Sequence, residues 1–169
     1  MTETVSNQEI TLNAVFVGGP FFNLVNMADK SMAARDVERF TRLIDYFEAL
    51  GATVYNAHRR ESWGAEFLGP EEATELDYTE IAGSDLFVAF PGVPASPGTH
   101  VEIGWASAMG KPIILFLERE QKHTFLVTGL HSFANVEYVY FDDPTAVVDQ
   151  LPAAIATVMG RSPRLPRQS

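Results

Sequence analysis

Short apolar runs alternate along the chain with longer segments in which apolar residues recur every three or four positions. Runs of this length that are rich in β-branched and aromatic residues indicate buried strands, and the three-to-four spacing indicates helices. The predicted strands are AVFVGG (14–19), ATVYNA (52–57), LFVAF (86–90), PIILFL (112–117) and EYVYF (137–141). The predicted helices are 31–50, 70–84, 101–109 and a final helix from about 144. Strands and helices therefore alternate throughout.

This alternation predicts one fold class. Apolar strands that are each followed by a helix are buried between two helical layers through right-handed crossovers. We therefore expect an α/β fold: a flavodoxin-like, doubly wound open sheet of about five parallel strands with helices on both faces. Ligands of such sheets bind beyond the carboxyl ends of the strands, so the loops after the first and third strands are the candidate site.

The same pattern predicts a single domain over residues 14–160. Residues 1–13 form an extension, and residues 161–169 (RSPRLPRQS) form a flexible basic tail without periodicity. The length of 169 residues fits one domain of ordinary size. No run approaches the roughly 20 apolar residues that span a bilayer, so we expect a cytoplasmic protein without a membrane partner.

Composition and charge remove several function classes. A formal charge of −10 repels polyanions, so a nucleic acid polymer is not an expected partner. Because the chain has no cysteine, disulfides, thiolate catalysis and cysteine-ligated metals are excluded. The chain lacks a phosphate-binding G-x-x-x-x-G-K-[ST] loop and a dinucleotide-binding G-x-G-x-x-G motif. The four histidines show no metal-ligand spacing, so we expect neither a metal nor a cofactor.

The segment from 90 to 111, FPGVPASPGTHVEIGWASAMGK, joins the third strand to a helix and carries candidate chemistry. Ser96, Gly98 and Thr99 offer hydroxyls and backbone amides just before a helix N-terminus, which suits a phosphate group. Glu102 then falls in the first helical turn, where the helix dipole favours an ionised carboxylate and thus a nucleophile. An equally simple interpretation is that Thr99 and Glu102 form an S/T-x-x-E capping box and that residues 96–98 are only a turn.

A second pair of acidic residues precedes this segment. Asp77 lies on the helix 70–84, and Asp85 lies at the start of the third strand. Two carboxylates in different surroundings can divide the work of glycosyl transfer, one as the nucleophile and one handling a proton. Alternatively, Asp77 belongs to a solvated helix face and Asp85 is a local cap.

Aromatic and basic residues follow the first two strands. Phe21 and Phe22 could stack on a base, and Arg59, Arg60 and Glu61 could pair with the base edge or with phosphate oxygens. The alternative is that the two phenylalanines close the core or an interface between subunits.

These motifs together resemble one family. The chain carries, in this order, a strand followed by GGPFF, then YNAHRR, then Asp77 eight residues before Asp85 of SDLFVAF, and then SPGTHVEIGWA followed by GKPI. This order of motifs resembles the nucleoside 2-deoxyribosyltransferase superfamily. Within it the chain most resembles the nucleotide N-glycosidases that hydrolyse CMP or hydroxymethyl-CMP in the biosynthesis of peptidyl-nucleoside antibiotics. The resemblance runs from about residue 14 to residue 140.

The resemblance implies roles for particular residues. Glu102 would attack the anomeric carbon of CMP, Asp77 would contact the base or its proton, and Asp85 would orient the site. Cytosine would leave, and water would hydrolyse the ribosyl-enzyme to ribose 5-phosphate. Ser96 and Gly98 would hold the 5′-phosphate. The other residues that the resemblance places at the substrate are Gly18, Gly19, Phe21, Phe22, His58, Arg59, Arg60 and Thr99.

Family members are homodimers or larger, with a neighbour completing the pocket. Thr124 or Thr128 is the candidate that reaches into the partner's site. One departure affects the substrate: related phosphate-dependent hydrolases carry a serine or arginine where this chain has Pro20 and Phe22, and this favours unmodified CMP over hydroxymethyl-CMP. Two alternatives remain, namely a nucleoside 2-deoxyribosyltransferase that exchanges bases through the same intermediate and a non-catalytic nucleotide-binding module.

Overall fold

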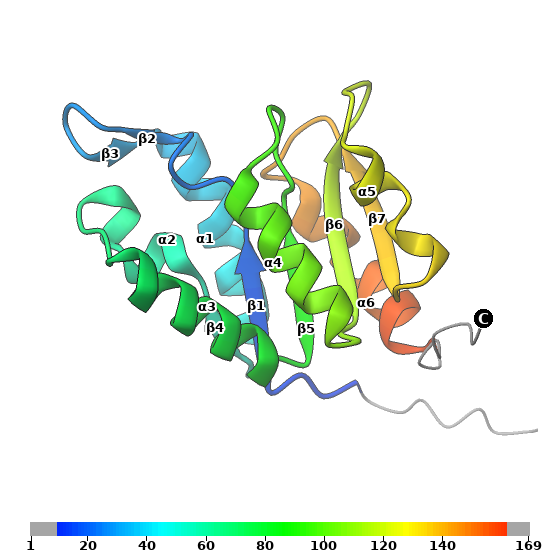
Figure 1. Cartoon of the computed structure of the whole chain (residues 1–169). Helices are drawn as coiled ribbons and strands as arrows, with labels where there is room; N and C mark the ends of the chain where they lie inside the picture. Colours follow the sequence, from blue (N-terminus) through cyan, green and yellow to red (C-terminus); the bar gives the residue numbers. More distant parts are fainter. Residues whose placement is uncertain (1–9, 162–169) are drawn as a thin grey trace, which may run out of the picture.

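The computed structural model of the chain describes residues 10–161, and its centre is one parallel sheet (Figure 1). Its strands are β1 (Ala14–Gly18), β4 (Thr53–Tyr55), β5 (Leu86–Ala89), β6 (Ile113–Glu118) and β7 (Val136–Phe141). They lie in the order β4-β1-β5-β6-β7, and every neighbouring pair is parallel. This is the flavodoxin-like order, with the reversal between β1 and β5. The predicted α/β fold is confirmed. Residues 1–9 of the predicted extension and residues 162–169 of the predicted tail lie outside the described residues.

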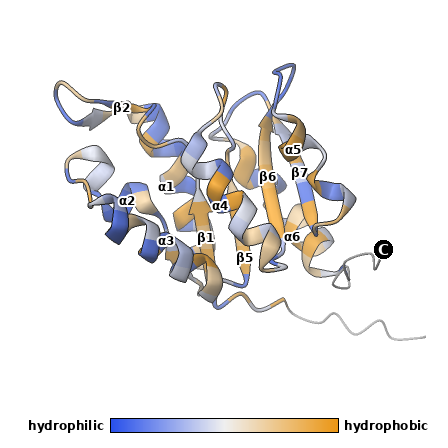
Figure 2. Ribbon diagram, in the orientation of Figure 1, coloured by the Kyte–Doolittle hydropathy of each residue, from blue (hydrophilic) through white to orange (hydrophobic). Residues whose placement is uncertain are grey.

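Two layers of helices cover the sheet. Successive strand residues point to opposite faces, so Val15 and Val17 of β1 join one hydrophobic core and Phe16 joins the other. Helices α1 (Ala34–Ala49) and α6 (Leu151–Met159) pack on the first face. Helices α3 (Pro70–Gly83) and α4 (Pro97–Ala108) pack on the second face, in front of the sheet in Figure 1. Figure 2 shows that the strands of the sheet are mostly hydrophobic, whereas hydrophilic residues are frequent along α2 and α3.

Several short elements were not predicted from the sequence. The strands β2 (Val25–Asn26) and β3 (Ser31–Met32) form an antiparallel hairpin, so the helix that was expected from residue 31 begins at Ala34. Helices α2 (Ala57–Arg60) and α5 (Phe125–Thr128) have one turn each. Short 3₁₀ turns cover 62–64, 130–132 and 147–150. Segments this short carry no detectable periodicity, because one turn places too few residues on a face.

The ends of two helices also differ from the prediction. Helix α4 begins at Pro97, four residues before the predicted start, because Ser96 caps it and proline fits the first helical position. The last helix, expected from about 144, begins at Leu151 after a 3₁₀ turn. Between residues 10 and 161, no helix combines the length and the apolar character that crossing a membrane requires.

Candidate active site

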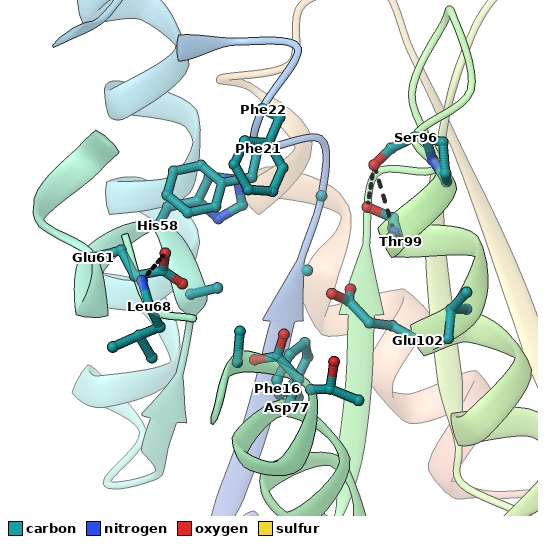
Figure 3. Close-up of a pocket in the computed structure, with 18 of the residues that line it drawn as sticks. Phe16, Phe21, Phe22, His58, Glu61, Leu68, Asp77, Ser96, Thr99 and Glu102 are labelled. Carbon is teal, nitrogen blue, oxygen red and sulfur yellow. Dashed lines mark hydrogen bonds between the residues drawn. The ribbon is translucent and has the colours of Figure 1, made fainter. Parts of the chain in front are cut away.

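A cavity of about 600 Å³ opens where the carboxyl ends of β1 and β5 face helices α2, α3 and α4 (Figure 3). This is the reversal point of the sheet, where ligands of such folds bind. The predicted site residues that line it are Gly18, Gly19, Phe21, Phe22, His58, Asp77, Ser96, Gly98, Thr99 and Glu102. The structure thus brings together residues that lie more than 80 positions apart in the sequence.

Ser96 organises one end of the cavity, at the N-terminus of α4. Its hydroxyl oxygen accepts hydrogen bonds from the backbone N–H of Thr99 at 3.4 Å and from the Thr99 hydroxyl at 3.0 Å. Ser96 is therefore the helix cap, and Thr99 is the third residue of the helix. The capping-box interpretation of Thr99 and Glu102 is wrong, because Glu102 lies in the second turn and is too far along α4 to reach the free amides.

Glu102 projects from α4 into the cavity. The residue is half-buried, but its Oε2 atom has no contact with solvent and no hydrogen-bond partner. A Cβ atom on Gly18 would lie 2.7 Å from this oxygen, closer than such atoms approach, so the end of β1 must be glycine for Glu102 to adopt this position. A buried carboxylate without a partner is costly to stability, and such costs concentrate at functional sites.

The electrostatics of Glu102 differ from the expectation of a permanently ionised group. Burial and, to a smaller extent, the charge of Asp77 raise its pKa, whereas Arg60 lowers it, and the pKa moves from 4.5 to about 8. The helix dipole does not dominate, because the carboxyl group lies beyond the first turn. Without substrate, Glu102 is therefore protonated at neutral pH.

Asp77 reaches the cavity from α3 and forms an ion pair with Arg60. Its Oδ1 accepts a hydrogen bond of 2.7 Å from Nη2 of Arg60, whose Nη1 donates to Glu80 at 2.7 Å. Burial raises the pKa of Asp77, whereas the hydrogen bond and charge of Arg60 lower it. Asp77 and Glu102 both point into the same space in Figure 3. They form a pair of carboxyl groups with different partners.

The two arginines do not line the cavity, contrary to the prediction that they bind the substrate. Arg60 is occupied by Asp77 and Glu80, and it acts on the site through Asp77. Arg59 donates to Glu48 at 2.7 Å and to the carbonyl oxygen of Val54 at 2.8 Å, on the other side of α2. Consecutive residues of a helix turn point in different directions, so adjacency in the sequence did not place them together.

His58 is a fixed, neutral part of the cavity wall. Its Nε2–H donates to the carbonyl oxygen of Pro20 at 2.8 Å, and its Nδ1 accepts from the amide of Asn56 at 3.1 Å. Because the carbonyl can only accept and the amide nitrogen can only donate, one tautomer is selected. Burial lowers the pKa of His58 from 6.5 to about 4.

Aromatic rings form the end of the cavity opposite Ser96. The ring centroid of Phe21 lies 4.7 Å from that of His58 and 5.6 Å from that of Phe67. Phe22 stacks on Phe67 with a centroid distance of 5.3 Å. Phe22 is 67% exposed, so it is not a core residue. Gly19 keeps this loop close to the core, because a Cβ there would lie 2.6 Å from the Phe40 ring.

Three predicted site residues lie elsewhere. Asp85 directly precedes β5, so it lies at the amino end of the strand, away from the cavity. Its carboxylate accepts from the backbone N–H groups of Asn13 and Ala14 at 2.7 and 3.2 Å. The prediction that Asp85 orients the site is wrong, and the local-cap alternative describes its contacts. Thr124 bonds to His100 at 3.0 Å, and Thr128 bonds to backbone carbonyls of its own helix.

Glu61, which the sequence analysis named beside the two arginines, does line the cavity, and its residue is only 5% exposed. The sequence analysis missed other residues of the cavity wall, namely Leu68, Thr74 and Trp105. Among residues 10–161, no cluster of three or more histidine or acidic side chains is placed to hold a metal ion.

Comparison with known proteins places the chain among nucleotide N-glycosidases. The solution structure of BlsM is 48% identical over 95% of this chain and 100% of that chain, with a TM-score of 0.80. The CMP N-glycosidase BcmB from Clostridium botulinum is 38% identical over 83% of this chain and 98% of that chain, with a TM-score of 0.64. A conserved protein from Enterococcus faecalis V583, at 16% identity over 89% and 99% of the chains and a TM-score of 0.51, shares the fold.

Neither the models of protein families nor the curated proteins give a match. BlsM and BcmB are both more than 30% identical to the chain and match most of it, and they agree with the resemblance that the sequence motifs indicate. The chain belongs to the nucleoside 2-deoxyribosyltransferase-like family of CMP N-glycosidases.

Proposed function

We propose that the protein hydrolyses the N-glycosidic bond of CMP to cytosine and ribose 5-phosphate through a covalent ribosyl–Glu102 intermediate. The observation that carries the proposal is the Oε2 atom of Glu102, which is buried, has no partner and borders the cavity beside Gly18. The 38% identity to the CMP N-glycosidase BcmB supports the same chemistry.

The carboxyl pair accounts for the protons of both steps. Since the pKa of Glu102 is about 8, the Glu102–Asp77 pair holds one proton before the substrate binds. When the substrate binds, Asp77 takes this proton and Glu102 becomes the carboxylate that attacks C1′. The C1′–N1 bond breaks, and the proton of Asp77 passes to the departing cytosine.

The second step restores the site. A water molecule attacks C1′ of the ribosyl-enzyme, and the Asp77 carboxylate accepts the proton of that water. The ester bond to Glu102 breaks, ribose 5-phosphate leaves, and the pair again holds one proton. Arg60 keeps Asp77 directed toward the cavity through its 2.7 Å hydrogen bond.

The phosphate of CMP is proposed to lie at the N-terminus of α4, with Ser96 and Gly98 in contact and Thr99 behind them. This helix has 12 residues, and its capped N-terminus borders the cavity, where free amides and the helix dipole favour an anion. The cytosine then extends toward Phe21 and Phe22 at the opposite end. Unmodified CMP is the proposed substrate, because Phe22 offers no polar group to a hydroxymethyl substituent.

We also propose that a second copy of the chain covers α5. Phe125 and Leu126 are 88% and 87% exposed. They follow Thr124, whose hydroxyl is hydrogen-bonded to His100 of helix α4. A dimer through this surface would bring the partner's Thr124 or Thr128 near the cavity. Light scattering should give twice the monomer mass for the wild type, and the monomer mass for Phe125→Glu. A monomeric wild type would contradict the dimer.

The decisive experiment is a base-release assay by chromatography with CMP, dCMP, hydroxymethyl-CMP and cytidine. We expect cytosine from CMP but not from cytidine, and no activity for Glu102→Ala or Asp77→Asn. Glu75→Gln, an exposed position on the same helix as Asp77, is the matched control and should retain activity. If base is released only when an acceptor base is added, the protein is a nucleoside 2-deoxyribosyltransferase. If no substrate reacts, the protein is a binding module.

A further inference from the structure

Glu61 is a buried carboxylate in the cavity wall that the proposed mechanism does not use. Glu61 is only 5% exposed, and a glutamate is rarely this buried unless its carboxylate is paired. Oε2 accepts a hydrogen bond of 3.2 Å from the backbone N–H of Leu68. Oε1 lies 3.7 Å from Nη2 of Arg60, which is farther than a hydrogen bond. Because a carboxylate can accept about four hydrogen bonds, Glu61 has capacity left for a ligand.

The position of Glu61 is fixed by an unusual turn. Ser62, Trp63 and Gly64 follow it with φ angles of 50°, 59° and 99°, three consecutive left-handed residues. Left-handed conformations cost roughly 1–2 kcal/mol for each residue that is not glycine, and such conformations cluster at functional sites. The backbone N–H groups of Gly64 and Glu66 both donate to the carbonyl oxygen of Glu61, at 3.0 and 3.2 Å, so the turn holds this residue.

Two other polar side chains at this end of the cavity are already occupied. Both ring nitrogens of His58 are hydrogen-bonded, to Pro20 and Asn56, and Asp77 is paired with Arg60. Asn23 and Thr74 also line the cavity, and both residues are exposed. Figure 3 shows Phe21, Phe22, His58 and Glu61 on one side of the cavity, and Ser96, Thr99 and Glu102 on the other. With phosphate at Ser96 and C1′ at Glu102, the base extends toward Glu61, where it meets aromatic faces and a buried carboxylate.

We propose that Glu61 selects the base: its carboxylate accepts a hydrogen bond from the exocyclic 4-amino group of cytosine, and it repels the 4-oxo group of uracil. This inference rests on the proposed function, because it assumes a pyrimidine nucleotide in the cavity. Cytosine offers an N–H donor at this position and uracil offers only an acceptor. Opposing a buried carboxylate with a carbonyl oxygen leaves both without partners, which is the arrangement that sites use to reject a substrate.

The test compares CMP with UMP for the wild type, Glu61→Gln and the control Glu66→Gln. Glutamine keeps the size of Glu61 and can still accept from Leu68, and it can also donate an N–H to the uracil oxygen. We expect kcat/KM for CMP to fall about 10- to 100-fold in Glu61→Gln, since a hydrogen bond to a charged group is lost. The ratio of CMP to UMP activity should fall at least tenfold. Glu66 is exposed in the same loop, and its variant should keep the wild-type ratio.

A merely structural role for Glu61 would give a different result. Glu61→Gln would then lower the activity toward CMP and UMP by the same factor, and an unchanged ratio overturns the proposal. A nucleotide whose pyrimidinone base carries hydrogen in place of the amino group provides a third substrate. The wild type should discriminate against it, and Glu61→Gln should discriminate less.

The proposal can fail separately from the proposed hydrolysis. Calorimetry with Glu102→Ala measures the binding of CMP and UMP without turnover. We expect CMP to bind at least tenfold more tightly than UMP, and the double variant Glu61→Gln/Glu102→Ala to lose this preference. Equal binding of CMP and UMP by Glu102→Ala overturns the role of Glu61. Absence of base release by the wild type overturns the hydrolysis, and the binding preference then still tests Glu61.

Discussion

Replacing Glu102 with glutamine should stabilise the protein while it abolishes catalysis. Glutamine has the shape of glutamic acid but cannot ionise, so it removes the need to place a charge on the buried Oε2 atom, which has no partner. Residues chosen for function are often suboptimal for stability, and a variant that is more stable and inactive is the expected signature. The effect should depend on pH in a way that identifies its cause.

The magnitude follows from the pKa of Glu102. The group titrates near 4.5 when unfolded and at about 8 in the folded protein. Between these values the folded protein retains a proton that the unfolded chain has lost, so the free energy of unfolding falls as pH rises. The contribution is complete below pH 4.5 and is lost through pH 8. At about 1.4 kcal/mol for each pH unit, the loss reaches up to about 3 kcal/mol at pH 7.

The assay is thermal or urea unfolding of the wild type and Glu102→Gln from pH 5 to pH 9. The two proteins should be nearly equal in stability at pH 5, and the variant should gain with each pH unit until the difference becomes constant above pH 8. At pH 7 the Tm difference should reach roughly 6–12 °C for a chain of this size. Other titrating groups are common to both proteins and cancel. A difference that is independent of pH, or a variant that is less stable at pH 8, would refute the reasoning.

Three further predictions follow from the walls of the cavity. Gly18→Ala should lower kcat/KM for CMP about 100-fold, because its Cβ would lie 2.7 Å from Glu102 Oε2 and displace the carboxyl group. Gly104→Ala is the control and should keep full activity, because a Cβ there meets nothing within 4 Å. Ser96→Ala should lower the Tm by about 2–4 °C through the loss of about 1 kcal/mol of capping, and should raise the KM for CMP; an unchanged KM would contradict the phosphate site. The imidazole of His58 should remain neutral in NMR spectra down to pH 5, since its pKa is about 4, and protonation near pH 6.5 would contradict its burial between Pro20 and Asn56.

The hydrophobic pattern of the chain was enough to place the sheet and the region of the site. Short apolar runs such as 86–90 are typical of strands buried between two layers, and their alternation with amphipathic helices leaves a parallel doubly wound sheet. The carboxyl ends of parallel strands meet at one edge, so the loops that carry Phe21 and Ser96 had to face the same space. The same rule locates Asp85 at the opposite edge, since it precedes its strand.

The electrostatics of the site depend on contacts that form only in the folded protein. Whether Glu102 is ionised depends on how completely Gly18 and its other neighbours exclude water, and on the distance to Asp77, and neither is encoded in the local sequence. The different roles of Arg59 and Arg60 likewise depend on the partner that each reaches in the folded protein: Arg60 contacts Asp77, and Arg59 contacts Glu48. Of the three neighbours Arg59, Arg60 and Glu61, only Glu61 lines the cavity, and the sequence could not single it out, because a short polar loop has no periodicity that reveals which of its side chains turns inward.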